Sequence, residues 1–182
     1  MIARKTGIPP GIPVVRENAG RALREREMGK SASTQIWTEG GIKLVLTNKK
    51  EALVFFRQAI KLNPKNAAGF FERGVSYQSA QKHEQAIFEY DRVIELDPQN
   101  IQAHFNRGVA HQALGNLEKA AQDFKEAVEL KPDHAQAYLH RGKALRQLGQ
   151  FRPALADFKA AARLGDPEAQ SILGSMGINW KA

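Results

Sequence analysis

Apolar residues return every three to four positions through most of the chain, which is the spacing that gathers side chains on one face of an α-helix. The segment Ala86, Ile87, Tyr90, Val93 and Ile94 shows this pattern along one face. Runs of this kind are separated by short breaks that contain glycine or proline. The pattern therefore predicts an all-α chain of short, amphipathic helices.

The pattern repeats with a period of 34 residues, in units that begin at Ser33, Ala67, Ile101 and Ala135. Two positions of each unit hold small residues, which we expect where paired helices touch: Gly40, Gly74, Gly108 and Gly142, and Ala52, Ala86, Ala120 and Ala154. Two later positions hold large residues, which we predict to form the core: Phe56, Tyr90, Phe124 and Phe158, and Leu62, Leu96, Leu130 and Leu164. Each unit thus predicts a hairpin of two helices.

Proline and glycine mark the ends of these helices. Pro64, Pro98 and Pro132 follow the second helix of a unit, where proline stops a helix because it lacks an amide donor. Gly115 and Gly149 stand at the bend between two helices, where a left-handed residue closes the first helix. A single hairpin cannot bury its apolar face alone, so the units are expected to stack on one another.

These residues resemble the tetratricopeptide repeat (TPR) family, although Lys43 and Thr47 stand where the family usually has an aromatic residue and a glycine. The resemblance implies an all-α, right-handed α-solenoid of four helix-turn-helix repeats, with the first helices lining a concave groove. The predicted TPR domain is 33–182, with repeats at 33–66, 67–100, 101–134 and 135–165 and a C-terminal capping helix at 166–176. Residues 1–32 fit no repeat and predict a basic N-terminal arm, extended or partly helical.

Composition narrows the functional classes. The chain has no cysteine, which excludes disulfides and thiolate metal sites, and it has no apolar stretch or N-terminal block typical of a membrane span or signal peptide. We therefore expect a cytoplasmic protein without a membrane partner. The net charge of +8 is divided, with basic segments at 1–66 and 135–165 and an acidic segment at 67–134. An unbroken basic stripe is more typical of a nucleic-acid surface, so this division argues against nucleic acid as the main partner.

No motif in the chain indicates catalysis. The sequence has no paired carboxylates, nucleophile triad, phosphate loop or nucleotide fingerprint in a suitable context, so we predict a protein that is not an enzyme and needs no cofactor. His104 and His111 lie seven residues apart, at positions where the family usually has core aromatic residues. We interpret them as packed substitutes for those residues and predict no metal site.

Arginine recurs at one position of three repeats, and an acidic residue follows each arginine after sixteen residues. The pairs are Arg73 with Glu89, Arg107 with Asp123, and Arg141 with Asp157. A row of arginines can bind phosphate or carboxylate groups, or it can form one ion pair within each repeat. We favour the structural ion pair, because the acid recurs together with the arginine.

The remaining face of the first helices predicts the binding site for a protein or peptide partner. Its members are Trp37, Leu44, Phe71, Val75, Gln78, Phe105, Val109, Gln112, Leu139, Lys143 and Arg146. This face is apolar at one end and basic at the other, which suits an amphipathic helix or an extended apolar peptide. Family members that grip a chaperone's C-terminal carboxylate use a set of basic and amide residues, of which only Asn106 is present here.

One alternative function and one hypothesis about the arm stay open. The chain could bind RNA or a ribonucleoprotein through the basic arm and the fourth repeat, and a steep dependence of binding on salt would distinguish that function. The arm also carries apolar residues in a proline-rich frame, which suggests that it folds back on the groove or joins a neighbouring copy by self-association.

Overall fold

The computed structural model describes residues 30–44 and 49–181, and within these ranges it contains nine α-helices and no strand. The all-α fold class is therefore confirmed. The chain divides into two compact units, Met1–Ser76 and Tyr77–Ala182. None of the helices in the described ranges is both long enough and apolar enough to cross a membrane.

The first unit contains α2 (Lys30–Leu44) and α3 (Lys49–Leu62), which pack against each other, and most of α4 (Ala67–Ser79). Helix α2 begins at Lys30, so it takes in the last residues of the predicted arm. The arm up to residue 29, including its proposed self-association, lies outside the described residues.

The α2–α3 pair differs from the later pairs by one residue in its register. A Cβ atom added at Gly41 would lie 2.5 Å from the ring of Phe56, whereas one added at Gly40 would meet Phe55 at 2.7 Å. The repeat pattern places Gly40, not Gly41, opposite Phe56. The amide Nδ2 of Asn66 donates a hydrogen bond to Oγ1 of Thr38 at 3.1 Å, which ties the start of α4 to α2.

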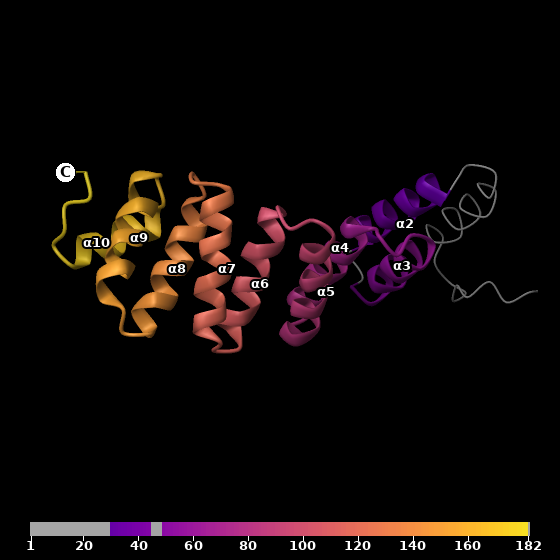
Figure 1. Cartoon of the computed structure of the whole chain (residues 1–182), viewed down its shortest axis with the longest axis horizontal. Coiled ribbons are helices and arrows are strands. Elements are labelled where there is room, and N and C mark those ends of the chain that lie inside the picture. The colour runs from indigo at the N-terminus through magenta and orange to yellow at the C-terminus, as the bar shows by residue number, and fades with distance from the viewer. Residues whose placement is uncertain (1–29, 45–48, 182) are drawn as a thin grey trace, which may run out of the picture. The chain divides into compact units, whose positions relative to one another are not determined.

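The second unit continues from the end of α4 with six helices, which Figure 1 shows side by side in chain order. They are α5 (His83–Leu96), α6 (Ile101–Ala113), α7 (Leu117–Leu130), α8 (Ala135–Gln147), α9 (Phe151–Arg163) and α10 (Pro167–Ser175). Each packs against the next, as expected for stacked hairpins. Helices α6 and α7 lie within the segment 101–134, α8 and α9 lie within 135–165, and α10 lies within 166–176.

Glycine allows the paired helices to approach closely. A Cβ atom at Gly108 would lie 2.8 Å from the ring of Phe124, and one at Gly142 would lie 2.8 Å from the ring of Phe158. Both rings are at most 1% exposed, so they fill the core as predicted. The prediction that Leu130 and Leu164 are core residues is wrong, because they are 36% and 41% exposed near the C-terminal ends of their helices.

The bends between helices use left-handed residues, as the sequence predicts. Gly115 and Gly149 have φ angles of +76° and +74°. Gln81 occupies the equivalent bend between α4 and α5 with a φ of +58°, a conformation that a residue with a side chain adopts at an energetic cost.

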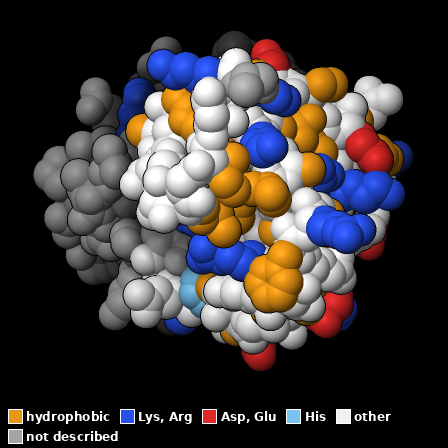
Figure 2. All heavy atoms as spheres, turned by 90° about the vertical axis from the view of Figure 1, so that its left-hand side faces the viewer, with side chains coloured by type: hydrophobic (Ala, Val, Ile, Leu, Met, Phe, Trp, Pro, Cys, Tyr) orange, Lys and Arg blue, Asp and Glu red, His pale blue; other side chains and the backbone are white. Residues whose placement is uncertain are grey.

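Helix α10 covers the last hairpin. The carboxylate of Asp166 accepts a hydrogen bond from the backbone N–H of Ala169 at 2.8 Å, which confirms the predicted N-cap. Ala169 and Leu173 are fully buried and belong to the core of α8 and α9. Figure 2 looks onto this end of the chain, where hydrophobic side chains lie among Lys and Arg side chains. The cap thus leaves part of its own apolar surface exposed, Met176 included.

Candidate functional site

Helices α6 and α8 form one continuous face of the second unit. They are the first helices of neighbouring repeats, and they touch each other although α7 separates them in the sequence. Nδ1 of His140 and Oε1 of Gln112 lie 2.9 Å apart, and this hydrogen bond joins the two helices. The predicted groove residues of each helix follow a spacing of four and three residues, so they share one side of their helix. The repeat pattern did not predict the His140 bridge.

On each helix, the first of the predicted groove residues packs into the protein. The ring of Phe105 lies 5.0 Å from that of His134, 5.5 Å from that of His140 and 5.7 Å from that of Phe124, between ring centroids. Its partly buried ring is therefore less accessible than the sequence pattern indicates. The prediction that Leu139 lines an open groove is corrected, because this side chain is 1% exposed and belongs to the core of α8, α9 and α10.

The later predicted groove residues of α6 and α8 are accessible to solvent. Val109, Gln112 and Lys143 are partly exposed, and Arg146 is exposed. The ammonium group of Lys143 pairs with Glu168 on the capping helix at 2.7 Å, a partner that the sequence interpretation missed. The guanidinium of Arg146 lies 5.7 Å from the centre of the Phe158 ring, within the range of a cation–π contact. The basic end of the face therefore consists of one paired lysine and one arginine open to solvent.

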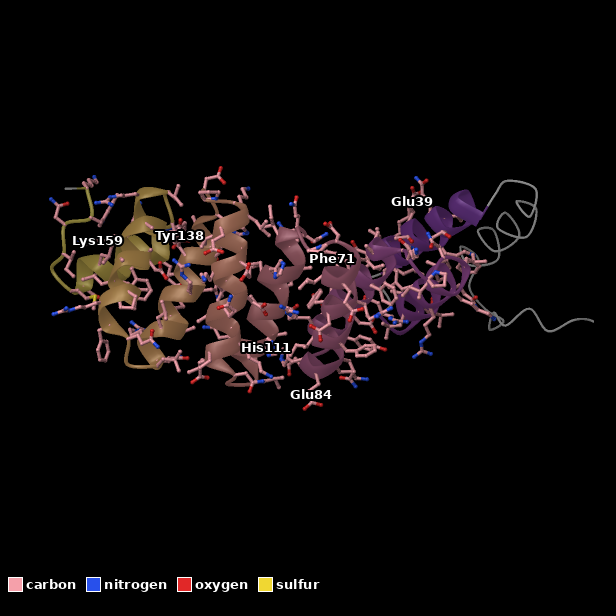
Figure 3. The ribbon with its side chains drawn as sticks, viewed as in Figure 1. Glu39, Phe71, Glu84, His111, Tyr138 and Lys159 are labelled. Atoms are coloured by element: carbon pink, nitrogen blue, oxygen red, sulfur yellow. The ribbon has the colours of Figure 1, made fainter. Side chains whose placement is uncertain are left out.

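The remaining predicted groove residues lie on other helices. Oε1 of Gln78 accepts a hydrogen bond from the hydroxyl of Tyr90 at 2.7 Å, so this amide connects α4 to α5. Trp37, Leu44, Phe71 and Val75 belong to the first unit and are partly exposed. The ring of Trp37 packs 4.9 Å from that of Phe55, and Figure 3 labels Phe71 on α4. Within the second unit, His140 of α8 contacts two of the predicted α6 residues, Gln112 and Phe105.

Two of the three arginine–acid pairs are confirmed as ion pairs within a repeat. Nε and Nη2 of Arg107 donate to Asp123 at 3.0 and 2.5 Å. Nε and Nη2 of Arg141 donate to Asp157 at 2.7 and 2.6 Å. Both carboxylates are at least 95% buried, so the arginines compensate their charge. The third predicted pair has its members in different units.

Arg107 makes one contact that the repeat pattern did not predict. Its remaining amino group, Nη1, donates to Asp91 on α5 at 2.7 Å, so this arginine joins two successive repeats. Burial alone would raise the pKa of Asp123, but hydrogen bonds from His104 and Arg107 more than offset burial and hold that pKa below its usual value.

Two histidines pack inside the third repeat. His104 and His111 are 7% and 9% exposed, as expected for substitutes of core aromatic residues. Nε2 of His104 lies 2.9 Å from the carbonyl of Pro98, and the nearby carboxylate of Asp123 raises the pKa of His104. Burial lowers the pKa of His111, which Figure 3 labels on α6. Across residues 30–44 and 49–181, no three His, Asp or Glu side chains converge in a way that could hold a metal ion.

Family comparison agrees with this geometry. A TPR repeat model matches residues 76–115, one Tetratricopeptide repeat model matches 101–134, and another matches 42–66 and 135–164. The chain belongs to the tetratricopeptide repeat family. The matched segments contain α3 and α5 to α9 and only the last residues of α4.

Solved structures share the TPR fold at low sequence identity. The structure of MamA MSR-1 C2 has a TM-score of 0.65 and 24% identity, over 85% of this chain and 93% of that one. MamA 41-end from Desulfovibrio magneticus RS-1 has a TM-score of 0.66 and 18% identity, over 84% and 96%. The first TPR of Spaghetti (RPAP3), bound to the HSP90 peptide SRMEEVD, has a TM-score of 0.62 and 24% identity, over 64% and 93%. No curated protein sequence matches the chain.

Proposed function

We propose that this chain is a non-catalytic interaction scaffold that binds a peptide or an amphipathic helix of a partner protein on the face of α6 and α8. The observation that carries the proposal is the accessible surface of Val109, Gln112, Lys143 and Arg146 on two adjoining first helices. This surface combines one apolar side chain, one amide and two cations, which suits a ligand with one apolar and one acidic end.

The low-identity neighbours are consistent with this function. The Spaghetti TPR holds a peptide whose sequence contains two glutamates and ends in an aspartate. In the present chain the acidic end of a ligand would meet Arg146 directly, whereas at Lys143 it would compete with Glu168. Surface ion pairs of this kind contribute up to about 1 kcal/mol, so apolar contact at Val109 is needed for useful affinity.

The local charges favour a protein over RNA as partner. Arg141 and Lys143, two of the cations of the fourth repeat, already pair with Asp157 and Glu168. A surface that follows a phosphate backbone needs cations that are free to replace counterions. The RNA alternative is therefore kept as an outcome of the capture experiment.

The test compares two double variants that change the charge equally on different faces of the chain. Val109→Glu with Arg146→Glu alters the proposed site, and Phe151→Glu with Arg152→Glu alters exposed residues at the start of α9. Partners captured from source lysate by the wild-type chain should be lost with the first variant and kept with the second. Equal recovery by both variants would contradict the site, and capture that nuclease treatment abolishes would favour the RNA alternative.

A further inference from the structure

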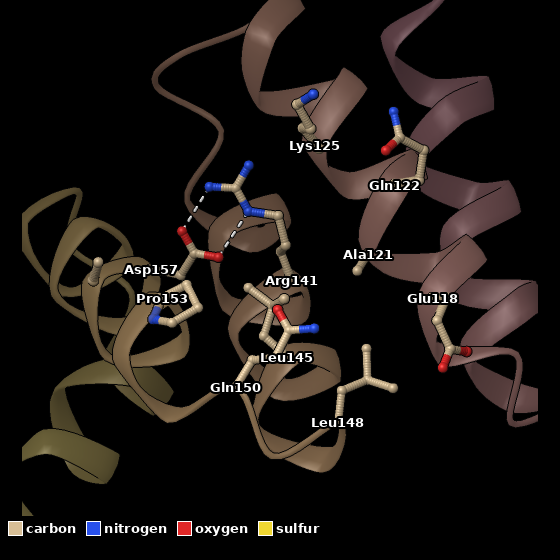
Figure 4. Close-up of a pocket in the computed structure, with 11 residues that line it drawn as sticks. Glu118, Ala121, Gln122, Lys125, Arg141, Leu145, Leu148, Gln150, Pro153 and Asp157 are labelled. Carbon is tan, nitrogen blue, oxygen red and sulfur yellow. Dashed lines mark hydrogen bonds and ion pairs between the residues drawn. The ribbon is translucent and has the colours of Figure 1, made fainter.

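A cleft lies on the side of α8 opposite to the α6–α8 face. In this cleft, the pattern of ion pairs seen around Arg107 is not repeated around Arg141. The cleft is lined by α7, α8 and α9, and its α8 side consists of Arg141, Leu145 and Leu148, the last directly after the helix (Figure 4). These three residues are spaced by four and three positions, on the side of α8 that faces away from Lys143 and Arg146. The cleft has a volume of about 480 Å³ and is open to solvent.

The two equivalent arginines of the second unit differ in one hydrogen bond, and the guanidinium of Arg141 also lies 5.4 Å from the centre of the Tyr138 ring. Arg107 uses Nε and Nη2 for its own repeat and Nη1 for Asp91 of the preceding repeat. Arg141 uses Nε and Nη2 in the same way, but its Nη1 has no hydrogen-bond partner among the described residues. The position that corresponds to Asp91, 34 residues later, is Lys125. A carboxylate of one repeat is thus replaced by an ammonium group in the next.

This replacement places two cations at one end of the cleft. Figure 4 shows Lys125 on α7 near the guanidinium of Arg141, with Leu145 and Leu148 lower in the cleft and Glu118 away from the cations. Among the described residues, the Lys125 ammonium contacts Glu129 at 3.7 Å, and its side chain is 52% exposed. An anion at this end would accept from Nη1 of Arg141 while Lys125 lies beside it.

We propose that this cleft is a second binding site, independent of the α6–α8 face, for an aspartate or glutamate side chain of a partner peptide that also carries an aliphatic residue. The chain itself shows which group suits Nη1 of the arginine, since the carboxylate of Asp91 fills that place on Arg107 at 2.7 Å. Leu145, Leu148 and Pro153 supply the apolar surface for the aliphatic residue. Glu118 and Asp157 in the same lining disfavour a dianion such as phosphate.

The experiment titrates the ¹⁵N-labelled full chain with two capped peptides, acetyl-Leu-Ala-Asp-amide and acetyl-Leu-Ala-Asn-amide, and with inorganic phosphate. We expect the Asp peptide to shift the signals of α7, α8 and the Arg141 side chain and to bind about tenfold more tightly than the Asn peptide. Equal binding of the two peptides, or a response at these signals to phosphate alone, would overturn the proposal.

The second part of the experiment uses a variant that copies the carboxylate of the preceding repeat. Lys125→Asp supplies the missing carboxylate from within the chain, so it should abolish binding of the Asp peptide and raise the melting temperature. Lys119→Asp makes the same charge change on the same helix outside the cleft lining, and it should keep at least about half of the affinity. Unchanged binding by Lys125→Asp, or an equal loss in both variants, would show that Arg141 and Lys125 do not form the site.

Discussion

At the scale of single residues, the close approach of paired helices rests on the absence of a side chain at one position. Gly108→Ala would place a Cβ atom 2.8 Å from the Phe124 ring, and the ring cannot swing out into solvent because it is fully buried. We expect a loss of about 1 to 3 kcal/mol in the free energy of unfolding, measured by urea denaturation. Gly174→Ala is the matched control.

Gly174 lies in α10 with no atom within 4 Å of an added Cβ. The same substitution should therefore stabilise the chain by up to about 1 kcal/mol through helix propensity. If both variants lost the same stability, helix–helix contact would not explain the glycine at position 108.

The bend at Gln81 predicts a stabilising substitution. Its φ of +58° strains a residue with a side chain, whereas glycine adopts the same conformation freely at Gly115. Gln81→Gly should raise the free energy of unfolding by roughly 0.5 to 1 kcal/mol, after allowance for the greater freedom of glycine in the unfolded chain. The reverse change, Gly115→Gln, should lower it by at least as much in thermal melts. Opposite signs are required, since no atom lies near a Cβ at Gly115.

The sequence predicted these residue roles because the repeat supplies four versions of each position. It failed where a residue's environment depends on a partner outside its own hairpin. The spacing of residues in α8 placed Leu139 on the same face as exposed residues, but the capping helix buries this side chain. Phe105 was expected to be free, yet its ring packs against His140 of the following repeat and against His134 in the loop before that repeat. Spacing within one helix carries no signal for such contacts.

At the scale of elements, the junction of α6, α7 and α8 predicts a dependence of stability on pH. Burial lowers the pKa of His111, His134 and His140. As the pH falls through about 6.5, the ordinary pKa of histidine, the unfolded chain takes up protons at these residues before the folded chain does. Stability therefore falls as the pH decreases. His104 acts in the opposite direction, because Asp123 raises its pKa.

Urea denaturation at a series of pH values from about 8 to about 5 would check this balance. The double variant His134→Gln, His140→Gln should lose less stability than the wild type between these limits. His104→Gln should lose more, because its contribution at low pH is removed. An identical slope for all three proteins would contradict the assigned directions.

The same junction predicts that Phe105 is a structural residue more than a binding residue. Phe105→Ala removes contacts with the rings of Phe124 on α7, His140 on α8 and His134 in the loop before α8. This loss should lower the free energy of unfolding by on the order of 2 kcal/mol. Arg146→Ala, on the accessible part of the same face, should leave the melting temperature nearly unchanged. A melting temperature that Phe105→Ala does not lower would return this ring to the binding surface.

At the scale of the second unit as a whole, stability should be distributed along the chain of helices. Its main contacts run between neighbouring helices, with α6 and α8 also touching, so each hairpin is stabilised by the hairpins beside it. The end hairpin has one neighbour less, and α10 supplies the missing surface with Ala169 and Leu173. Loss of the cap should therefore loosen the C-terminal end before it affects the middle.

Asp166→Ala tests this directly, because it removes the carboxylate that accepts from the N–H of Ala169 and from the side chain of Gln136. A lost N-cap costs about 1 kcal/mol. Hydrogen exchange followed by mass spectrometry should show faster exchange in α9 and α10, with α6 and α7 nearly unchanged. Asp133→Ala removes an exposed carboxylate before α8 and serves as the control. Uniformly faster exchange in α5 to α10 would mean that the unit unfolds as a single cooperative block, and that the contacts between neighbouring helices do not act separately.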